Sequence, residues 1–233
     1  ILIGLVGSEM CIRDSNVIGA SAVDIVRNNI RIRDVSAQGF ADTTTGGFGH
    51  LTIIPGTSTN LDGDGVEFAG GVNNSHVSID SNTIDSGAGN GVKFTGDVTG
   101  ETTVGIIKNT IDAGTDGVVF KGLVTNSLFR RESEVLIASN KKIVGGNNGI
   151  SFEGESSNKT DIVIRDNKNI EGESGHGVSH TGGLNNAELV ILDNKKIKGD
   201  QDGIHVEGDL KGGSTVEIRG NKNIRGVNDD GVH

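Results

Sequence analysis

The sequence contains no Trp or Tyr, and it has a single Pro, a single Cys and a single Met among 233 residues. Hydrophobic residues make up only 33% of the chain, whereas Gly alone contributes 38 residues. This composition does not suit an ordinary layered globular domain, but it is typical of short strands separated by tight turns. No apolar run approaches the roughly 18 residues that a membrane-spanning helix needs, so we expect no membrane span in this segment.

The charge balance limits the kind of partner that the chain can bind. The formal net charge is -10. Nucleic-acid binding depends on clustered Lys and Arg side chains that neutralise phosphates. We therefore expect no nucleic-acid partner, although a local basic stripe remains compatible with this total.

Residues 1–15, which contain Cys11 and Met10, differ from the rest of the chain. They resemble translated sequencing-adapter read-through, and they lack the basic start and small-residue cleavage site of a signal peptide. We interpret them as a non-native segment and residues 16–233 as one domain. Without Cys11 the chain has no Cys, so a disulfide cannot hold the domain together.

From residue 16 onward, one pattern recurs about every 27 residues. A Gly precedes a short Val/Ile-x-Phe/Val stretch, and a later Val-x-Ile stretch leads to an Asn and, two positions on, an Ile. The Asn position holds Asn28, Asn82, Asn109, Asn140, Asn167, Asn194 and Asn221, with Gly56 in the second copy. The Gly position holds Gly39, Gly65, Gly91, Gly117, Gly149, Gly177, Gly203 and Gly231. Two independent markers that keep one period indicate a repeat array.

The alternation of apolar residues within each copy predicts three short strands with one inward face. On these residues the chain resembles the right-handed parallel β-helix repeats of pectin-lyase-like proteins and of many bacterial surface proteins. The resemblance implies stacked coils with an internal, hydrogen-bonded Asn ladder. We therefore predict an all-β, right-handed parallel β-helix solenoid of about eight coils. A leucine-rich repeat has a similar skeleton, but the apolar positions here are Val and Ile, and the Gly-rich remainder cannot form a stable helix.

The sequence stops at Gly231-Val232-His233, partway into a further copy. A solenoid normally needs polar caps over its open core and strand edges. We therefore expect a domain truncated at both ends, with flanking coils of a longer parent chain as its neighbours.

The copy that runs from Gly117 to Asn140 has about five more residues between its Gly and its Asn than the other copies have. The additional residues lie near Ser127–Glu132 and include Phe129, Arg130 and Arg131. A projecting loop there is a candidate contact for a partner. The alternative is an ordinary tolerated insertion.

Residues 174–179, SGHGVS, resemble the Gly-His-Gly motif of polygalacturonase-type glycoside hydrolases. The resemblance implies a catalytic role for His176, and Asp116 in Thr115-Asp116-Gly117 is its matching acid. The paired Asp of the family corresponds to Asn147-Asn148, and two neutral amides cannot supply the acid and base of glycoside hydrolysis. The alternative is that His176 is a variable turn residue, because other copies carry Asp or Asn at this position.

Asn60, Asp62 and Asp64 match the opening of a calcium-binding loop, which makes Asp62 and Asp64 candidate metal ligands. The twelfth position of the loop would be Gly71 rather than the Glu that completes such a site. The alternative is a set of Asp-Gly and Asn-Gly turns in which Gly takes a positive φ. Calcium between stacked turn carboxylates is the only cofactor that the sequence indicates.

Four lysines directly follow Asn residues of the predicted ladder and should stack into a basic stripe: Lys141, Lys168, Lys195 and Lys222. Such a stripe could bind an anionic polysaccharide or another cell-surface ligand. The alternative is a solvated turn that discourages lateral aggregation.

These observations leave two classes of function. The first is a structural or adhesive repeat segment of a secreted or cell-surface bacterial protein, which we expect to be extracellular. The second is a carbohydrate-active β-helix enzyme, either a polysaccharide lyase or a polygalacturonase-like hydrolase. Such enzymes build a cleft from long loops on neighbouring coils. The single modest insertion and the absence of a convergent acidic set favour the first class.

Overall fold

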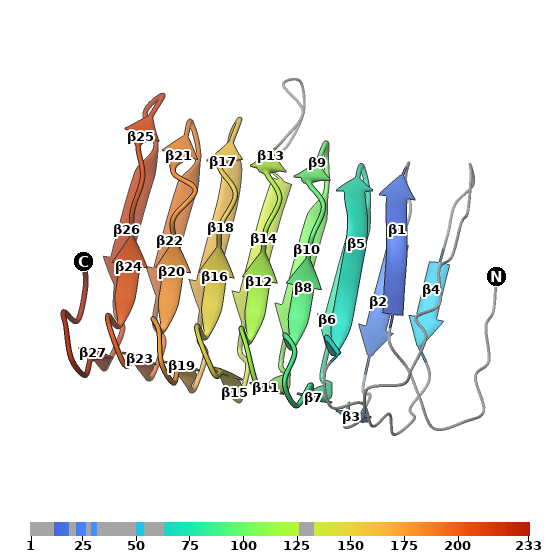
Figure 1. Cartoon of the computed structure of the whole chain (residues 1–233). Helices are drawn as coiled ribbons and strands as arrows, with labels where there is room; N and C mark the ends of the chain where they lie inside the picture. The colour runs from blue at the N-terminus through green and yellow to red at the C-terminus, as the bar shows by residue number, and fades with distance from the viewer. Residues whose placement is uncertain (1–11, 19–21, 27–28, 32–49, 54–62, 126–132) are drawn as a thin grey trace.

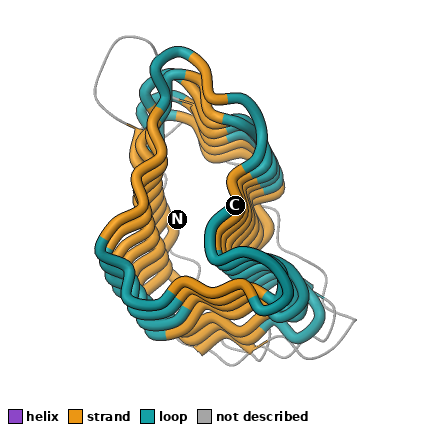
Figure 2. The backbone as a smooth tube through the Cα atoms, turned by 90° about the vertical axis from the view of Figure 1, so that its left-hand side faces the viewer, coloured by secondary structure: helices purple, strands orange, loops and turns teal. Residues whose placement is uncertain are grey.

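The computed structural model describes residues 12–18, 22–26, 29–31, 50–53, 63–125 and 133–233. These residues form strands and turns, with no helix in the described ranges. The strands pair in parallel, because each strand lies beside the equivalent strand of the neighbouring coil and runs in the same direction. Figure 1 shows the coils side by side along one axis, and Figure 2 shows that they superimpose when seen end on. The chain is therefore an all-β parallel β-solenoid, as the sequence predicted.

Sheet A contains the strands that follow the Gly position of each copy. It begins with β1 (Ile12–Ile18), which pairs with the long strand β5 (Val66–Asn73). In later coils the same stretch is divided into two short strands. The first strands are β8 (Val92–Phe94), β12 (Val118–Phe120), β16 (Ile150–Phe152), β20 (Val178–His180) and β24 (Ile204–Val206). The second strands are β9 (Val98–Thr99), β13 (Val124–Thr125), β17 (Ser156–Ser157), β21 (Leu184–Asn185) and β25 (Leu210–Lys211).

Sheets B and C contain the strands before and after the Asn position. Sheet B comprises β2 (Ala22–Val26), β4 (His50–Ile53), β6 (His76–Asp80), β10 (Thr103–Ile107), β14 (Ser133–Ala138), β18 (Thr160–Arg165), β22 (Glu188–Leu192) and β26 (Thr215–Arg219). Sheet C comprises β3 (Asn29–Arg31), β7 (Thr83–Asp85), β11 (Thr110–Ala113), β15 (Lys142–Gly145), β19 (Ile170–Gly172), β23 (Ile197–Gly199) and β27 (Ile224–Gly226).

About six coils are complete in the described part of the chain, so the predicted count of eight is wrong. They run from β5 to β27. Among the described residues, the second copy contributes only β4, which lies outside β2 in sheet B instead of between β2 and β6. This copy carries Gly56 at the Asn position and Pro55 directly before it. It therefore lacks a backbone N–H and a side-chain amide that the other coils use to join their neighbours.

The boundary expected at residue 16 falls inside a strand. Strand β1 begins at Ile12 and pairs with β5 from its first residue. The interpretation of residues 1–15 as a non-native segment stays a prediction, and Cys11 lies outside the described residues.

The inward positions predicted from the alternation form the core. Val77 and Ile79 of β6 are fully buried, as are the corresponding residues of β10, β14, β18 and β22, whereas Val216 and Ile218 of β26 are partly buried. In sheet A, the rings of Phe68, Phe94, Phe120 and Phe152 stack with centroids 4.5, 4.5 and 4.8 Å apart and with nearly parallel planes. Like residues of successive coils therefore pack on one another.

The predicted Asn ladder is present from Asn82 to Asn221. In each rung, Oδ1 accepts a hydrogen bond from the backbone N–H of the preceding Asn, and in every rung but that of Asn109 and Asn140 it also accepts one from Nδ2 of that Asn, for example at 3.0 and 2.9 Å between Asn140 and Asn167. From Asn109 to Asn221, Nδ2 also donates to a main-chain oxygen of the preceding coil, as from Asn167 to Ile137 at 2.9 Å. Every polar group of these buried amides is thus paired, which makes their burial tolerable. Asn28 lies outside the described residues.

The residue before each ladder Asn has a left-handed backbone, which the sequence analysis did not predict. The six φ values lie between 54° and 66°, at Ser81, Lys108, Ser139, Asp166, Asp193 and Gly220. This conformation bends the chain between sheets B and C so that the Asn side chain points inward. Only Gly220 is a glycine, so the other five coils accept a strained backbone in return for the ladder.

The repeat Gly is required for close packing, and the prediction that it takes a positive φ is wrong. Gly65, Gly91, Gly117, Gly149, Gly177 and Gly203 are absent from the residues with positive φ. A Cβ on Gly149 would lie 2.6 Å from the carbonyl oxygen of Gly177 and 2.8 Å from Cγ2 of Ile170. The turn before sheet A therefore approaches the next coil and sheet C too closely for any side chain.

Candidate functional site

The residues that precede the repeat Gly form a second column of hydrogen bonds, which we call the turn ladder. It consists of Asp64, Asn90, Asp116, Asn148, His176, Asp202 and Asp230. The backbone N–H of each member donates to the side chain of the member one coil earlier, at distances of 2.8 to 3.3 Å. Five of these acceptors are carboxylate or amide oxygens, and the sixth is Nδ1 of His176. His176 therefore occupies a structural position that Asp or Asn fills in the other coils.

The turn ladder separates the two residues that the sequence offered as catalytic candidates. Asn148 lies between them: its N–H donates to Oδ1 of Asp116 at 3.0 Å, and its own Oδ1 accepts the N–H of His176 at 2.8 Å. Asp116 and His176 are thus two coils apart, about 10 Å at the usual strand spacing. Burial raises the pKa of Asp116 above its ordinary value, although hydrogen bonds from Asn148 oppose this effect.

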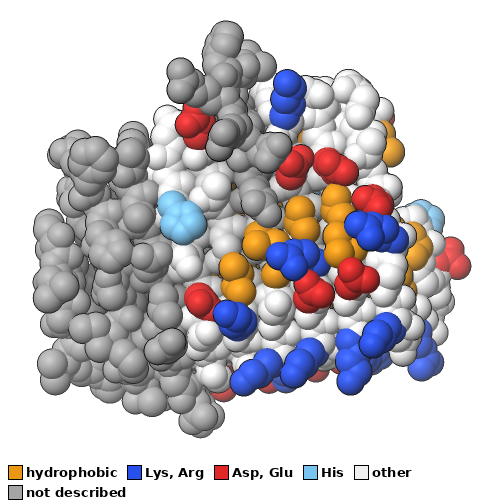
Figure 3. Space-filling model, turned by 180° about the vertical axis from the view of Figure 1, so that it is seen from behind, with side chains coloured by type: hydrophobic (Ala, Val, Ile, Leu, Met, Phe, Trp, Pro, Cys, Tyr) orange, Lys and Arg blue, Asp and Glu red, His pale blue; other side chains and the backbone are white. Residues whose placement is uncertain are grey.

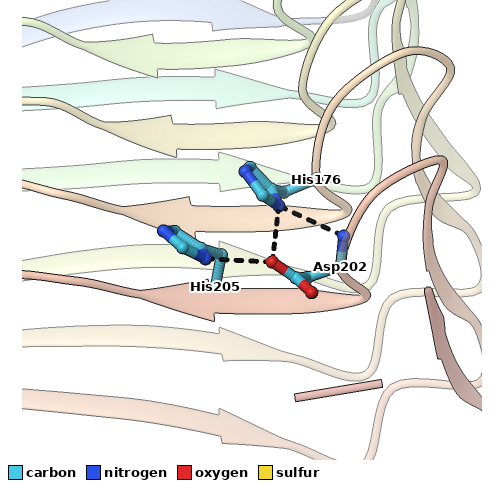
Figure 4. Close-up of side chains that lie close together, drawn as sticks. All are labelled: His176, Asp202 and His205. Atoms are coloured by element: carbon cyan, nitrogen blue, oxygen red, sulfur yellow. Dashed lines mark hydrogen bonds and ion pairs between the residues drawn. The ribbon is translucent and has the colours of Figure 1, made fainter. Parts of the chain in front are cut away.

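His176 instead belongs to a cluster with Asp202 and His205, which we call the histidine cluster (Figure 4). Oδ2 of Asp202 lies 3.2 Å from Nδ1 of His176 and 3.0 Å from Nδ1 of His205. One ligand atom from each of the three side chains lies within 4.8 Å of the other two. The imidazole rings of His176 and His205 stack at 4.3 Å, and His233 continues the stack at 5.0 Å.

The fold positions each member of this cluster. His176 and Asp202 occupy the same turn position in successive coils, so the solenoid period places one beside the other. His205 is the outward residue of β24, where Ser179 of β20 is its neighbour in the sheet. Oδ1 of Asp202 accepts the N–H of Asp230 at 3.0 Å, which leaves Oδ2 directed at the two imidazoles.

Two features of the cluster affect its protonation. Burial and the neighbouring His205 lower the pKa of His176 below its ordinary value, although the charge of Asp202 opposes this shift. Nδ1 of His176 also lies 3.3 Å from the N–H of Asp202, which donates to it when the imidazole is neutral. Imidazole nitrogens and a carboxylate oxygen are donors that divalent transition metals prefer.

The four lysines that follow ladder Asn residues form an exposed column. The backbone N–H groups of Lys141, Lys168, Lys195 and Lys222 each donate to the carbonyl of the preceding coil's ladder Asn at 2.8 to 2.9 Å. The lysines therefore follow one another at one per coil, and none of the four has an ion-pair partner among the described residues. Figure 3 shows Lys and Arg side chains gathered in a row along one edge of the molecule.

The outer face of sheet B carries a short apolar strip next to these charges. Leu136, Val163 and Val190 occupy one outward column of β14, β18 and β22. Leu136 and Val163 are partly exposed. Figure 3 shows hydrophobic side chains in the middle of one face of the molecule, with charged groups of both signs around them.

Of the two predicted calcium ligands, Asp62 lies outside the described residues. Asp64 accepts hydrogen bonds from Asn90, and its Oδ2 lies 2.9 Å from Nζ of Lys93. Lys93 also lies 3.2 Å from Glu67. Burial lowers the pKa of Lys93, but its contacts with Asp64 and Glu67 raise it above its ordinary value overall. Asp64 therefore already contacts a cation of the protein, and calcium binding there stays a prediction.

The candidate partner contact at Phe129, Arg130 and Arg131 lies outside the described residues. Two other features escaped the sequence analysis. His180 occupies the Phe position of its coil, and its ring stacks on Phe152 at 5.6 Å in the core. The histidine cluster also went unnoticed, although the repeat period by itself places His176 and Asp202 in successive coils.

Comparison with protein families, with curated proteins and with solved structures finds no match for this chain. Within the described residues, no helix is long and apolar enough to cross a membrane. The parallel β-solenoid is therefore the class that the fold itself defines, and its function has to be argued from its surface.

Proposed function

We propose that this chain is a structural and adhesive repeat segment of a secreted or cell-surface protein. Its inner face is filled by the Phe stack, the aliphatic columns and the Asn ladder. The outer face therefore carries the groups that a partner would contact. Because each coil repeats the last, the outer side chains form straight columns along the axis, which suits an extended ligand better than a small one.

The observation that carries this proposal is the exposed lysine column. Lys141, Lys168, Lys195 and Lys222 present four positive charges in a line, one per coil and about 4.8 Å apart. An anionic polysaccharide carries carboxylate or sulfate groups at regular intervals along an extended chain. Its binding would relieve the mutual repulsion of the lysines, which only water and salt screen in the free protein.

Salt-dependent binding to polygalacturonate, with neutral dextran as the reference, tests this proposal. We compare the wild type with a variant in which all four column lysines are replaced by Gln. The control removes the same number of charges elsewhere, at the exposed lysines Lys108, Lys121, Lys159 and Lys211. We expect the column variant to lose affinity and salt dependence, and the control to retain most of both.

Equal losses in the two variants would mean that only net charge matters, and no binding by the wild type would refute the polysaccharide ligand. The same samples test the carbohydrate-active alternative. Depolymerisation of polygalacturonate that disappears in His176→Asn would favour an enzyme over an adhesive segment.

A further inference from the structure

We propose that His176, Asp202 and His205 bind one divalent transition-metal ion, for which Zn²⁺ is the reference. The three ligand atoms are Nδ1 of His176, Oδ2 of Asp202 and Nδ1 of His205. They converge from two successive turns and from strand β24 (Figure 4). Within the described ranges, this is the one group of three His, Cys, Asp or Glu side chains with such spacing.

The separations of these atoms suit a small metal ion. Zn²⁺ binds imidazole nitrogen and carboxylate oxygen at about 2.0 to 2.2 Å, which places tetrahedral ligands about 3.3 Å apart. The two separations from Oδ2 are 3.2 and 3.0 Å, so little rearrangement is needed around Asp202. Ca²⁺ and Mg²⁺ take oxygen ligands and would not use the two imidazoles.

The environment of His205 favours a cation at its Nδ1. Two carboxylates approach its two ring nitrogens, with Oδ2 of Asp202 at 3.0 Å from Nδ1 and Oε2 of Glu207 at 3.5 Å from Nε2. A neutral imidazole has one N–H and can donate to only one of them. A metal ion at Nδ1 with the proton on Nε2 satisfies both, and a carboxylate on the distal nitrogen is the usual support for a ligating His.

A metal ion at His176 would break one hydrogen bond and would make one close contact favourable. Its Nδ1 accepts the N–H of Asp202 at 3.3 Å, and a metal ion would take this lone pair. The lost hydrogen bond is long, whereas the close contact between Nδ1 and Oδ2 at 3.2 Å would become favourable with a cation between them.

The other coils supply replacements that remove each ligand but keep the fold. His176→Asn introduces the residue that the turn ladder has at Asn90 and Asn148. Asp202→Asn preserves an oxygen acceptor for the N–H of Asp230. His205→Ser introduces the residue that faces outward from β16 and β20, where Ser151 and Ser179 stand. The matched control is His76→Asn, because His76 lies on sheet B and its Nδ1 contacts Oγ1 of Thr103 at 2.6 Å.

The test is titration of the untagged, metal-free protein with Zn²⁺ by calorimetry, with Co²⁺ absorption spectra to report the ligand geometry. We expect one equivalent to bind to the wild type and to His76→Asn. We expect each ligand variant to weaken binding by about tenfold or more, and His176→Asn/His205→Ser to abolish it. Zn²⁺ should also raise the Tm of the wild type but not of the double variant.

Absence of stoichiometric Zn²⁺ binding by the wild type would overturn the proposal. Equal affinity in the wild type and the double variant would do the same, because the ion would then lie elsewhere. Unchanged Tm values of the variants without metal establish that each still folds.

Discussion

Replacement of His180 by Phe tests whether a neutral imidazole is buried in the core. His180 is fully buried between Phe152 and Val206, at the position that holds Phe in four earlier coils. Burial lowers its pKa from 6.5 to about 4. In the unfolded chain the same imidazole binds a proton near its ordinary pKa.

The direction of the pH effect follows from this difference. Between pH 6.5 and 4 the unfolded chain binds more protons at His180 than the folded chain does. The stability contributed by this group is therefore complete above pH 6.5 and is lost as the pH falls towards 4. A pKa lowered by this much reduces the free energy of unfolding by about 2 kcal/mol at pH 5 relative to pH 8.

The assay is urea unfolding at pH 8 and pH 5, followed by circular dichroism because the chain has no Trp or Tyr. We expect the His180→Phe variant to lose about 2 kcal/mol less than the wild type between the two pH values. Taking the difference removes contributions from other groups, such as His176, that titrate equally in both proteins.

Ser156 requires a companion variant. Its Oγ lies 3.1 Å from Nε2 of His180, and His180→Phe would leave this buried hydroxyl without that partner. The preceding coils have Val98 and Val124 in the same column. Ser156→Val/His180→Phe should therefore be more stable than His180→Phe alone, by about 1 to 3 kcal/mol. Identical pH dependence in the wild type and both variants would refute the assignment of a low pKa to His180.

Three further substitutions test the inner columns by urea unfolding at neutral pH. Phe94→Ala removes a ring from the middle of the Phe stack and should cost about 3 to 5 kcal/mol, whereas a cost within error would mean that the ring is exposed. Asn167→Ala leaves buried groups of Asn140 unpaired and should cost about 1 to 3 kcal/mol, and an unchanged midpoint would argue against the ladder. Gly149→Ala places a Cβ 2.6 Å from the carbonyl oxygen of Gly177. We expect it to lower the urea midpoint more than Gly213→Ala does, because a Cβ on Gly213 meets no atom within 4 Å, although φ is positive there. The reverse order would contradict close packing at the repeat Gly.

The repeat period was sufficient to predict most of the fold. Because equivalent positions of successive coils stack, the spacing of Asn140, Asn167 and Asn194 predicted the ladder. The alternation at Val77 and Ile79 predicted the buried face of sheet B. The lysine column followed from the same logic. The predicted count of eight coils included the copy with Pro55 and Gly56, although this copy lacks the Asn of the ladder.

Features that depend on turn conformation could not be predicted in this way. The period placed His176 beside Asp202, but the approach of His205 to Asp202 depends on how the chain turns at Gly203. A Gly that follows Asp or Asn also has two possible explanations: it can allow a positive φ, or it can allow close packing. Only the structure distinguishes them, and it shows close packing at Gly149 and its equivalents.

The most direct test of the stacked-coil arrangement is hydrogen exchange of the Asn side-chain amides, measured by NMR. Nδ2 of Asn140 and of Asn167 each donates both protons within the solenoid, to Oδ1 of the next rung and to a main-chain oxygen of the preceding coil. We predict that these protons exchange as slowly as the backbone amides of β14 and β18. Exchange as fast as that of the exposed Asn228 side chain would contradict the ladder.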